Sequence, residues 1–228
     1  TTMSTTTSLP PATTTMSTTT SLPPATTTMS TTTLVPAGTK PPNRVLTAED
    51  FLRVMVVGDS VTYEIEPALT AALEHTGLVK SSNRTQVGFG LSRWPVYAWW
   101  EVWPPALAEV NPEAVVFQTG IWDVNDVFYG ELRRPAPEDV DWAEQYVFLM
   151  EVAVEVLTAD GAILFWQTML PSTDPAPVER LNRLVVDLTG RDERVVLVDL
   201  TPGFTDSDGA YRRLVDRDGE LWPLRKVD

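Results

Sequence analysis

The chain contains no cysteine and only one histidine, His75, among its 228 residues. Without cysteine there is no disulfide scaffold, no thiolate metal site and no thiol nucleophile. A single histidine also excludes a metal centre built from several imidazoles. Basic residues are scarce, because 17 lysines and arginines stand against 31 aspartates and glutamates, for a net charge of −14 at pH 7. Nucleic-acid binding requires clustered positive charge, so we expect no nucleic-acid partner.

Long apolar runs are missing as well. No stretch approaches the roughly 20 apolar residues that span a bilayer, and no signal peptide is recognisable. Neither a dinucleotide-binding glycine motif nor a phosphate-binding loop with its lysine occurs. The chain starts with Thr1 rather than Met, and we therefore expect it to be part of a longer protein.

The first 39 residues contain a repeat of 13 residues. The sequence TTMSTTTSLPPAT fills positions 1–13, returns unchanged at 14–26 and recurs in altered form at 27–39. This unit is too short, and too poor in large apolar side chains, to build a core. Residues 1–46 are therefore predicted to be a disordered Thr/Ser/Pro-rich linker. In an exported protein it would be a mucin-like, O-glycosylated stalk, and otherwise an undecorated spacer.

Residues 47–228 hold every acidic residue and all eight tryptophans, and they are numerous enough for one well-filled core. Short apolar runs predict buried strands at 53–57, 114–118, 162–166 and 195–198. Apolar residues at helical spacing follow at 65–73, 141–158 and 178–188. This alternation predicts an α/β fold, a three-layer α/β/α sandwich with a central parallel sheet of the flavodoxin-like type. Ligands bind at the carboxyl ends of such strands, so the chemistry should lie there.

Gly58-Asp59-Ser60 stands at the first of these strand ends. The Ser60 hydroxyl can leave the sheet there, beside helix-start N–H groups that lack partners and could stabilise an oxyanion. An ordinary N-cap serine would give the same triplet. The G-x-S-x-G nucleophile elbow is absent, which argues against the α/β-hydrolase fold.

The order of the motifs resembles that of the SGNH (GDSL-like) hydrolase superfamily, over about residues 47–228. The first block of that family, Gly-Asp-Ser, corresponds to the triplet that ends in Ser60, and the resemblance implies that Ser60 is the nucleophile. The second block is a loop glycine whose N–H helps to form the oxyanion hole. Gly88 and Gly90 are the candidates for it, and Gly90 is preferred.

The third block of the family is Gly-x-Asn-Asp, and Gly120-Ile121-Trp122-Asp123 occupies its place. We take Asp123 to stand where the family usually has Asn, with Asn125 two residues later. The resemblance then implies an oxyanion hole made by Ser60, Gly90 and a group near Asp123 or Asn125. An ionised Asp cannot donate a hydrogen bond, so this position departs from the family pattern.

The last block, Asp-x-x-His, supplies the general base and the carboxylate that orients it, and this sequence has no such pair. His75 follows Ser60 by 15 residues on one helix, on the order of 20 Å away, and we expect it to be structural or on the surface. The final residues Arg225-Lys226-Val227-Asp228 resemble the beginning of the last block. Asp228 is then the catalytic aspartate and the histidine lies beyond it. The alternative is a degenerate, inactive domain.

Within the superfamily the chain is most similar to the SGNH domain that follows the membrane-embedded domain of bacterial acyltransferases. The Gly-x-Trp-Asp block, the Trp-rich segment before it and the Arg-Lys-x-Asp ending carry this similarity. It implies a serine esterase or acyltransferase acting on O-acyl esters, above all O-acetyl esters, of cell-surface carbohydrate. It also implies an extracytoplasmic, membrane-tethered location, an N-terminal acyltransferase domain in the parent protein, and neither cofactor nor metal. The oligomeric state stays open.

Two other functions are compatible with the sequence. The fold could serve a noncatalytic, glycan-binding surface domain. Carboxylates at the strand ends could instead hold Mg²⁺ for phosphoryl transfer, with Asp59, Asp123 and Asp126 as ligands. An aromatic segment precedes the second core strand and would either stack on sugars or pack in the core; it comprises Trp94, Tyr97, Trp99, Trp100 and Trp103.

Overall fold

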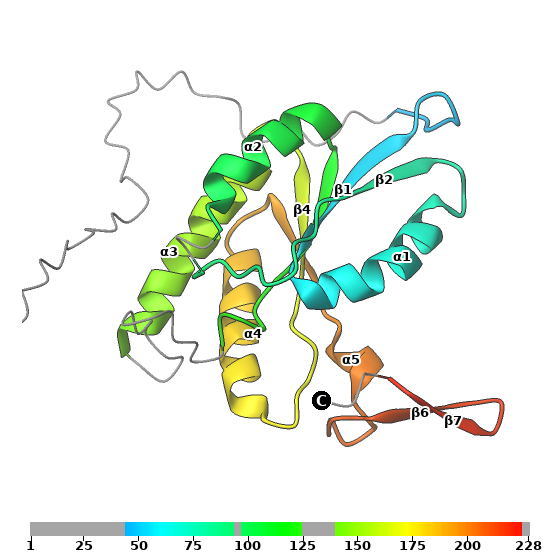
Figure 1. Cartoon of the computed structure of the whole chain (residues 1–228), viewed down its shortest axis with the longest axis vertical. Helices are drawn as coiled ribbons and strands as arrows, with labels where there is room; N and C mark the ends of the chain where they lie inside the picture. Colours follow the sequence, from blue (N-terminus) through cyan, green and yellow to red (C-terminus); the bar gives the residue numbers. More distant parts are fainter. Residues whose placement is uncertain (1–43, 94–96, 125–139, 225–228) are drawn as a thin grey trace, which may run out of the picture. The chain divides into compact units, whose positions relative to one another are not determined.

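Four short apolar runs form four of the strands in a five-stranded parallel sheet, in a computed structural model that describes residues 44–93, 97–124 and 140–224. They are β1 (Leu52–Gly58), β3 (Ala114–Gln118), β4 (Ile163–Gln167) and β5 (Val195–Val198). A fifth strand, β2 (Val79–Asn83), lies at the edge beside β1, and the order across the sheet is β2-β1-β3-β4-β5 (Figure 1). The predicted fold class is confirmed.

Helices cover the sheet from its two sides because successive residues of each strand point to opposite faces. Met55 and Val57 of β1 belong to the larger core cluster, which includes residues of α2 (Trp99–Val110), α3 (Val140–Leu157) and α4 (Pro175–Thr189). Val54 and Val56 point the other way, toward α1 (Ser60–Glu74). In Figure 1, α2, α3 and α4 accordingly lie on one side of the strands and α1 on the other.

The aromatic segment before β3 packs into the core. Trp99 and Trp103 are almost fully buried, and the indole N–H of Trp99 donates to the carbonyl of Leu91 at 3.1 Å. Tyr97 and Trp100 pack against the same cluster, whereas Trp94 lies outside the described residues. For the described members of this segment, core packing is therefore confirmed over an exposed sugar-binding platform.

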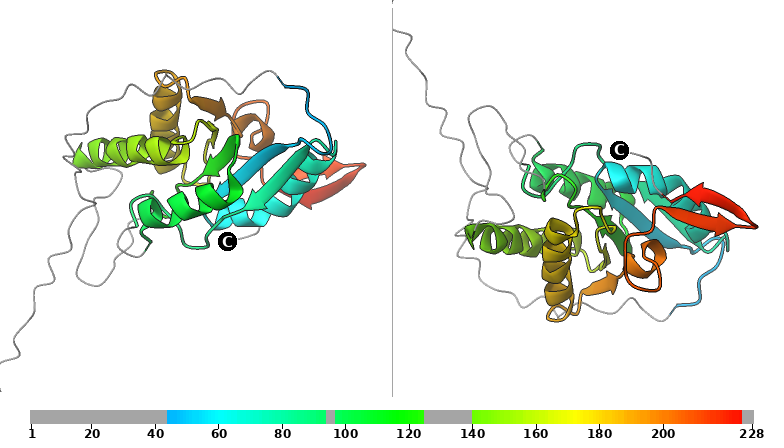
Figure 2. Two further views of the ribbon diagram at one scale, coloured as in Figure 1. Left: turned by 90° about the horizontal axis from the view of Figure 1, so that it is seen from above. Right: turned by 90° about the horizontal axis from the view of Figure 1, so that it is seen from below.

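The chain after β5 forms smaller elements. A short helix, α5 (Thr201–Phe204), is followed by β6 (Leu214–Arg217) and β7 (Glu220–Pro223). The last two strands pair antiparallel as a hairpin separate from the main sheet (Figure 2). No helix among the described residues is long and apolar enough to cross a membrane.

Arg44, in the segment predicted to be a linker, contacts the folded domain. Its guanidinium forms ion pairs with Asp50 at 2.6 Å and with Glu113 at 2.8 Å, and it donates to the carbonyl of Phe51 at 3.0 Å. Glu113 directly precedes β3, so these bonds fix Arg44 at the end of the sheet where the strands begin. Arg44 is therefore bound to the folded domain by its side chain.

Candidate active site

Ser60 is the first residue of α1 and follows β1 after one intervening residue, Asp59. Asp59 is the N-cap of the helix, and its Oδ1 accepts a hydrogen bond from Val61 N at 2.8 Å. The Ser60 N–H therefore belongs to the first turn, where backbone donors have no acceptor within the helix. The Ser60 side chain is half-buried. Ser60 is thus a strand-end serine beside an available backbone N–H, and its role as nucleophile stays a prediction.

The turn before Ser60 requires a glycine because another segment lies against it. A Cβ on Gly58 would collide with the Thr62 hydroxyl and with the carbonyl oxygen of Gln118. Thr62 Oγ1 lies 2.9 Å from Gln118 Oε1 and 3.2 Å from that carbonyl oxygen, in a fully buried position. These contacts fix the start of α1 to the carboxyl end of β3.

Asp59 joins the nucleophile turn to the third block. Its side chain is only 1% exposed, and Oδ2 accepts a weak hydrogen bond from Ile121 N at 3.4 Å. Burial raises the pKa of Asp59 from 3.8 to about 6. The N–H groups of Val61 and Ile121 oppose this rise in pKa, and the nearby charge of Asp123 adds to it. Asp59 is thus a buried carboxyl group held between two site loops.

Asp123 accepts hydrogen bonds from five donors. Its Oδ1 accepts from Ser92 N at 2.9 Å and from Ser92 Oγ at 2.7 Å. Its Oδ2 accepts from Leu91 N at 3.3 Å, Thr119 Oγ1 at 3.2 Å and Tyr146 OH at 3.1 Å. Burial, followed by the effect of Asp123, raises the pKa of Tyr146 well above 10, so its phenol stays a neutral donor. We call Asp123 and its donor residues, Leu91, Ser92, Thr119 and Tyr146, the Asp123 cluster.

The hydrogen bonds of Asp123 do not favour the role expected for it as an oxyanion donor. Both of its oxygens face donors, and an ionised carboxylate has no hydrogen to offer. Counted from Gly120, it is Trp122 that stands in the place of the family's Asn, and Asp123 corresponds to the final Asp. Asp123 instead fixes the loop that carries Gly90.

Gly90 lies against the third block, as the resemblance implies. A Cβ on Gly90 would be 2.9 Å from Asp123 Oδ1 and 3.2 Å from Trp122 Cβ, so only glycine allows this approach. Gly88 has a φ of +81°, and its carbonyl accepts from Arg93 Nη1 at 2.6 Å. Both glycines therefore shape one loop, and Gly90 is the one beside the third block.

An arginine that the motif analysis missed also adjoins this block. The Arg93 guanidinium stacks on the Trp122 ring, with its carbon 4.4 Å from the ring centroid, and the residue is 6% exposed. Stacking of this kind satisfies the face of a guanidinium while leaving its edge to hydrogen bonds. Nothing in the sequence spacing distinguishes Arg93 from a surface arginine.

Some predicted site residues are not placed. Asn125, Asp126 and Asp228 lie outside the described residues. His75 is exposed at the C-cap of α1, at the opposite end of the helix from Ser60, in accordance with the expected surface role. In the described part of the chain, no three His, Cys, Asp or Glu side chains are grouped to hold a metal ion.

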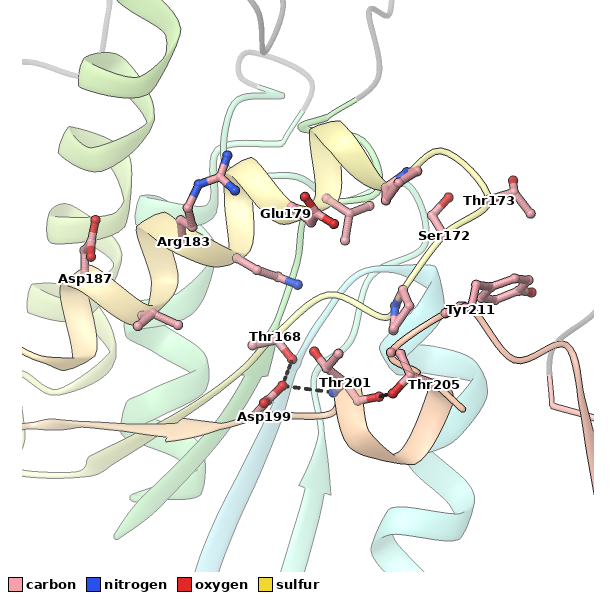
Figure 3. A pocket seen from close by; sticks show the side chains of 17 residues that line it. Thr168, Ser172, Thr173, Glu179, Arg183, Asp187, Asp199, Thr201, Thr205 and Tyr211 are labelled. Carbon is pink, nitrogen blue, oxygen red and sulfur yellow. Dashed lines mark hydrogen bonds between the residues drawn. The ribbon is translucent and has the colours of Figure 1, made fainter. Parts of the chain in front are cut away.

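A cavity of about 640 Å³ opens at the carboxyl ends of β4 and β5 (Figure 3). It is lined by Thr168, Asp199 and residues of α4, but Ser60, Gly90 and Asp123 are not among its walls. With neighbouring strands about 4.8 Å apart, the end of β4 is two strands, or roughly 10 Å, from the end of β1. Ser60 and the cavity therefore lie near each other at the carboxyl ends of the strands but are separate features.

Comparison with known proteins identifies a family and a fold. The sequence profile of the family described as "Protein of unknown function (DUF459)" matches residues 53–228. A search of curated proteins gives no match.

Solved structures resemble the chain at low sequence identity. A GDSL-like lipase from Bacteroides thetaiotaomicron is 15% identical, with a TM-score of 0.50 over 75% of this chain and 80% of that one. A protein from Slackia heliotrinireducens, named as an SGNH hydrolase, is 16% identical, with a TM-score of 0.51 over 76% and 90%. An alpha/beta hydrolase enzyme from the metagenome of Lake Arreo is 16% identical, with a TM-score of 0.55 over 75% and 87%. At these identities the likeness concerns the fold.

Proposed function

Since the chain belongs to the DUF459 family and has the fold of the SGNH hydrolases, we propose that it is a serine esterase or acyltransferase domain of SGNH type. The observation that carries this proposal is the position of Ser60. The serine begins α1 at the carboxyl end of β1, and the Asp123 cluster fixes the Gly90 loop against the third block on the same edge.

The proposed reaction begins with attack of Ser60 Oγ on the carbonyl carbon of an ester. The carbonyl electrons move to oxygen, and the N–H groups of Ser60 and Gly90 stabilise the resulting oxyanion. Collapse of the tetrahedral intermediate breaks the bond to the alcohol and leaves an acyl-serine. A water molecule or an acceptor hydroxyl then takes the acyl group and restores the Ser60 hydroxyl.

The general base in the proposed reaction is inferred from the Asp-x-x-His block of the SGNH hydrolases. Asp228 is the orienting carboxylate, and a histidine three residues after it in the parent protein removes the Ser60 proton and returns it to the leaving alcohol. His75 cannot take this role, since it is at the far end of α1. The chain of 228 residues is then expected to be inactive or nearly so.

The proposed substrate is an O-acyl ester, above all an O-acetyl ester, of cell-surface carbohydrate. One feature of the sequence supports this setting: the Thr/Ser/Pro repeats resemble an extracytoplasmic stalk. In this proposal the domain is tethered outside a bacterial membrane, behind an N-terminal acyltransferase domain of the parent protein.

Fluorophosphonate labelling of Ser60 tests the proposed reaction. One version of the protein ends at Asp228, and the second continues through the next 30 or so codons of the parent gene. Labelling of the second version only, lost in Ser60→Ala, is the expected result. Absence of labelling in both, while circular dichroism shows folded protein, would contradict the enzyme and favour a noncatalytic surface domain.

A further inference from the structure

The cavity beside the proposed active site has two unlike walls (Figure 3). One is α4, which contributes charged side chains at successive turns: Glu179, Arg183 and Asp187. The other is formed by Asp199 and by the segment that follows it. At about 640 Å³ the cavity falls within the range of small-molecule sites, which is roughly 300–1,000 Å³.

Asp199 is oriented in this cavity by a hydrogen-bond relay. Its Oδ1 accepts from Thr201 N at 2.9 Å and from Thr168 Oγ1 at 3.3 Å, and Thr168 Oγ1 in turn accepts from Leu200 N at 2.9 Å. Partial burial acts to raise the pKa of Asp199, but the hydrogen bonds from Thr201 and Thr168 outweigh it and lower the pKa below 3.8. Asp199 is therefore an ionised acceptor with a fixed direction at the wall of the cavity.

The lining determines the chemical class of a ligand. The lining includes three carboxylates, of Glu179, Asp187 and Asp199, and one guanidinium, of Arg183, so its excess of negative charge repels anions. They form no metal site, because the described residues contain no group of three such ligands. Hydroxyl groups and apolar surface complete the walls, from residues that include Ser172, Thr173, Thr205, Pro171, Val178 and Val186. Carboxylate and hydroxyl groups beside apolar surface suit a ligand with many hydroxyls and apolar C–H faces.

The position of the cavity relates it to Ser60. Thr168 follows β4 and Asp199 follows β5, which places them two and three strands from β1, or roughly 10 and 14 Å. This is too far for the acyl group of an ester at Ser60. The distance is suitable for another unit of an extended substrate, one that runs along the carboxyl ends of the strands from Ser60 to the cavity.

We propose that this cavity is a carbohydrate subsite, which binds a neutral or amino-sugar unit of a glycan through Asp199 and Glu179 and rejects acidic sugars. The inference rests on the proposed function for the substrate class, and it adds the site and the charge preference. The subsite supplies binding and not chemistry, so a variant in it weakens glycan binding without affecting the reactivity of Ser60.

Isothermal titration calorimetry with three oligosaccharides tests the subsite. The probes are chitotetraose, which is neutral, its de-N-acetylated form, which is cationic, and tetragalacturonate, which is anionic. We expect the first two to bind and the third to bind at least tenfold more weakly. In Asp199→Asn and in the exposed helix variant Glu179→Gln, we expect at least a tenfold loss of affinity for the bound probes. Asp160→Asn, in the exposed turn after α3, should leave affinity unchanged.

Failure of the subsite and failure of the enzyme can be told apart. Ser60→Ala should bind the oligosaccharides like the unaltered protein, because Ser60 does not line the cavity. Unchanged affinity in both cavity variants, equal or tighter binding of tetragalacturonate, or no saccharide binding by the folded protein would each overturn the subsite. Fluorophosphonate labelling reports separately on Ser60, and its absence would refute the proposed reaction while leaving measured saccharide binding intact.

Discussion

The substitution Asp59→Asn should stabilise the protein at neutral pH, although it removes a charged N-cap. The carboxyl is 1% exposed, and burial raises its pKa from 3.8 to about 6. At about 1.4 kcal/mol per pKa unit, keeping Asp59 ionised in the folded state costs about 3 kcal/mol. Asparagine carries no charge and is an equally good N-cap, since its Oδ1 can still accept from Val61 N.

The sign of the pH dependence follows from the raised folded-state pKa. The folded chain binds the Asp59 proton more tightly than the unfolded chain does, so this group stabilises the fold fully below pH 3.8. That contribution is lost as pH rises to about 6. The difference in unfolding free energy between Asp59→Asn and the unaltered protein should therefore grow by up to about 3 kcal/mol from pH 4 to pH 7.5.

Urea unfolding followed by tryptophan fluorescence measures this difference at pH 4, 5, 6 and 7.5. The weak bond from Ile121 N is lost at every pH in the variant, so it shifts all four values equally and does not affect the trend. Asp174→Asn, at the exposed N-cap of α4 with no capping bond, controls for the substitution itself. A difference that stays constant with pH, or one that shrinks toward neutral pH, would refute the reasoning.

Two further substitutions test the Asp123 cluster and the Gly90 loop. Asp123→Ala removes the acceptor of the buried Thr119 and Tyr146 hydroxyls and should lower the unfolding free energy by about 3 kcal/mol, measured by urea unfolding, whereas Tyr146→Phe should cost only about 1 kcal/mol. A cost for Asp123→Ala no larger than that for Tyr146→Phe would contradict the cluster. Gly90→Ala places a Cβ 2.9 Å from Asp123 Oδ1 and should slow fluorophosphonate labelling of Ser60 at least tenfold in the extended version of the protein. Labelling at an unchanged rate would exclude Gly90 from the oxyanion hole.

Apolar patterning predicts four of the five strands but not the polar edge strand β2. The runs at β1, β3 and β4 lie inside the sheet and are mostly buried, and burial is what makes a strand apolar, whereas β5 is apolar although it lies at the other edge. The edge strand β2 reads Val-Lys-Ser-Ser-Asn and depends on backbone bonds to β1 rather than on its side chains. The helix α2 contains Pro104 and Pro105, which locally indicate a turn, although the burial of its tryptophans keeps it helical.

In the candidate site, likewise, some residues could be predicted from the sequence and others could not. Ser60 could be proposed from the sequence because a short motif lies directly after a strand end, and Gly90 could be proposed through the family resemblance. The Asp123 cluster could not, since Tyr146 lies 23 residues from Asp123 and Ser92 lies 31 residues before it. Likewise, the stacking of Arg93 on Trp122 arises only when two loops meet in the folded chain. Motifs therefore locate the proposed nucleophile, and long-range contacts decide which groups surround it.

The bonds from Leu91 N and Ser92 N to Asp123 have a consequence for hydrogen exchange. Loop amides usually exchange through small local openings, but these two are bound to a carboxylate that also accepts from Tyr146 on α3. Freeing either amide requires the loop to separate from the core of the domain. Leu91 and Ser92 should therefore exchange slowly and together with β3, as part of the same cooperative unit, despite lying in a connecting segment.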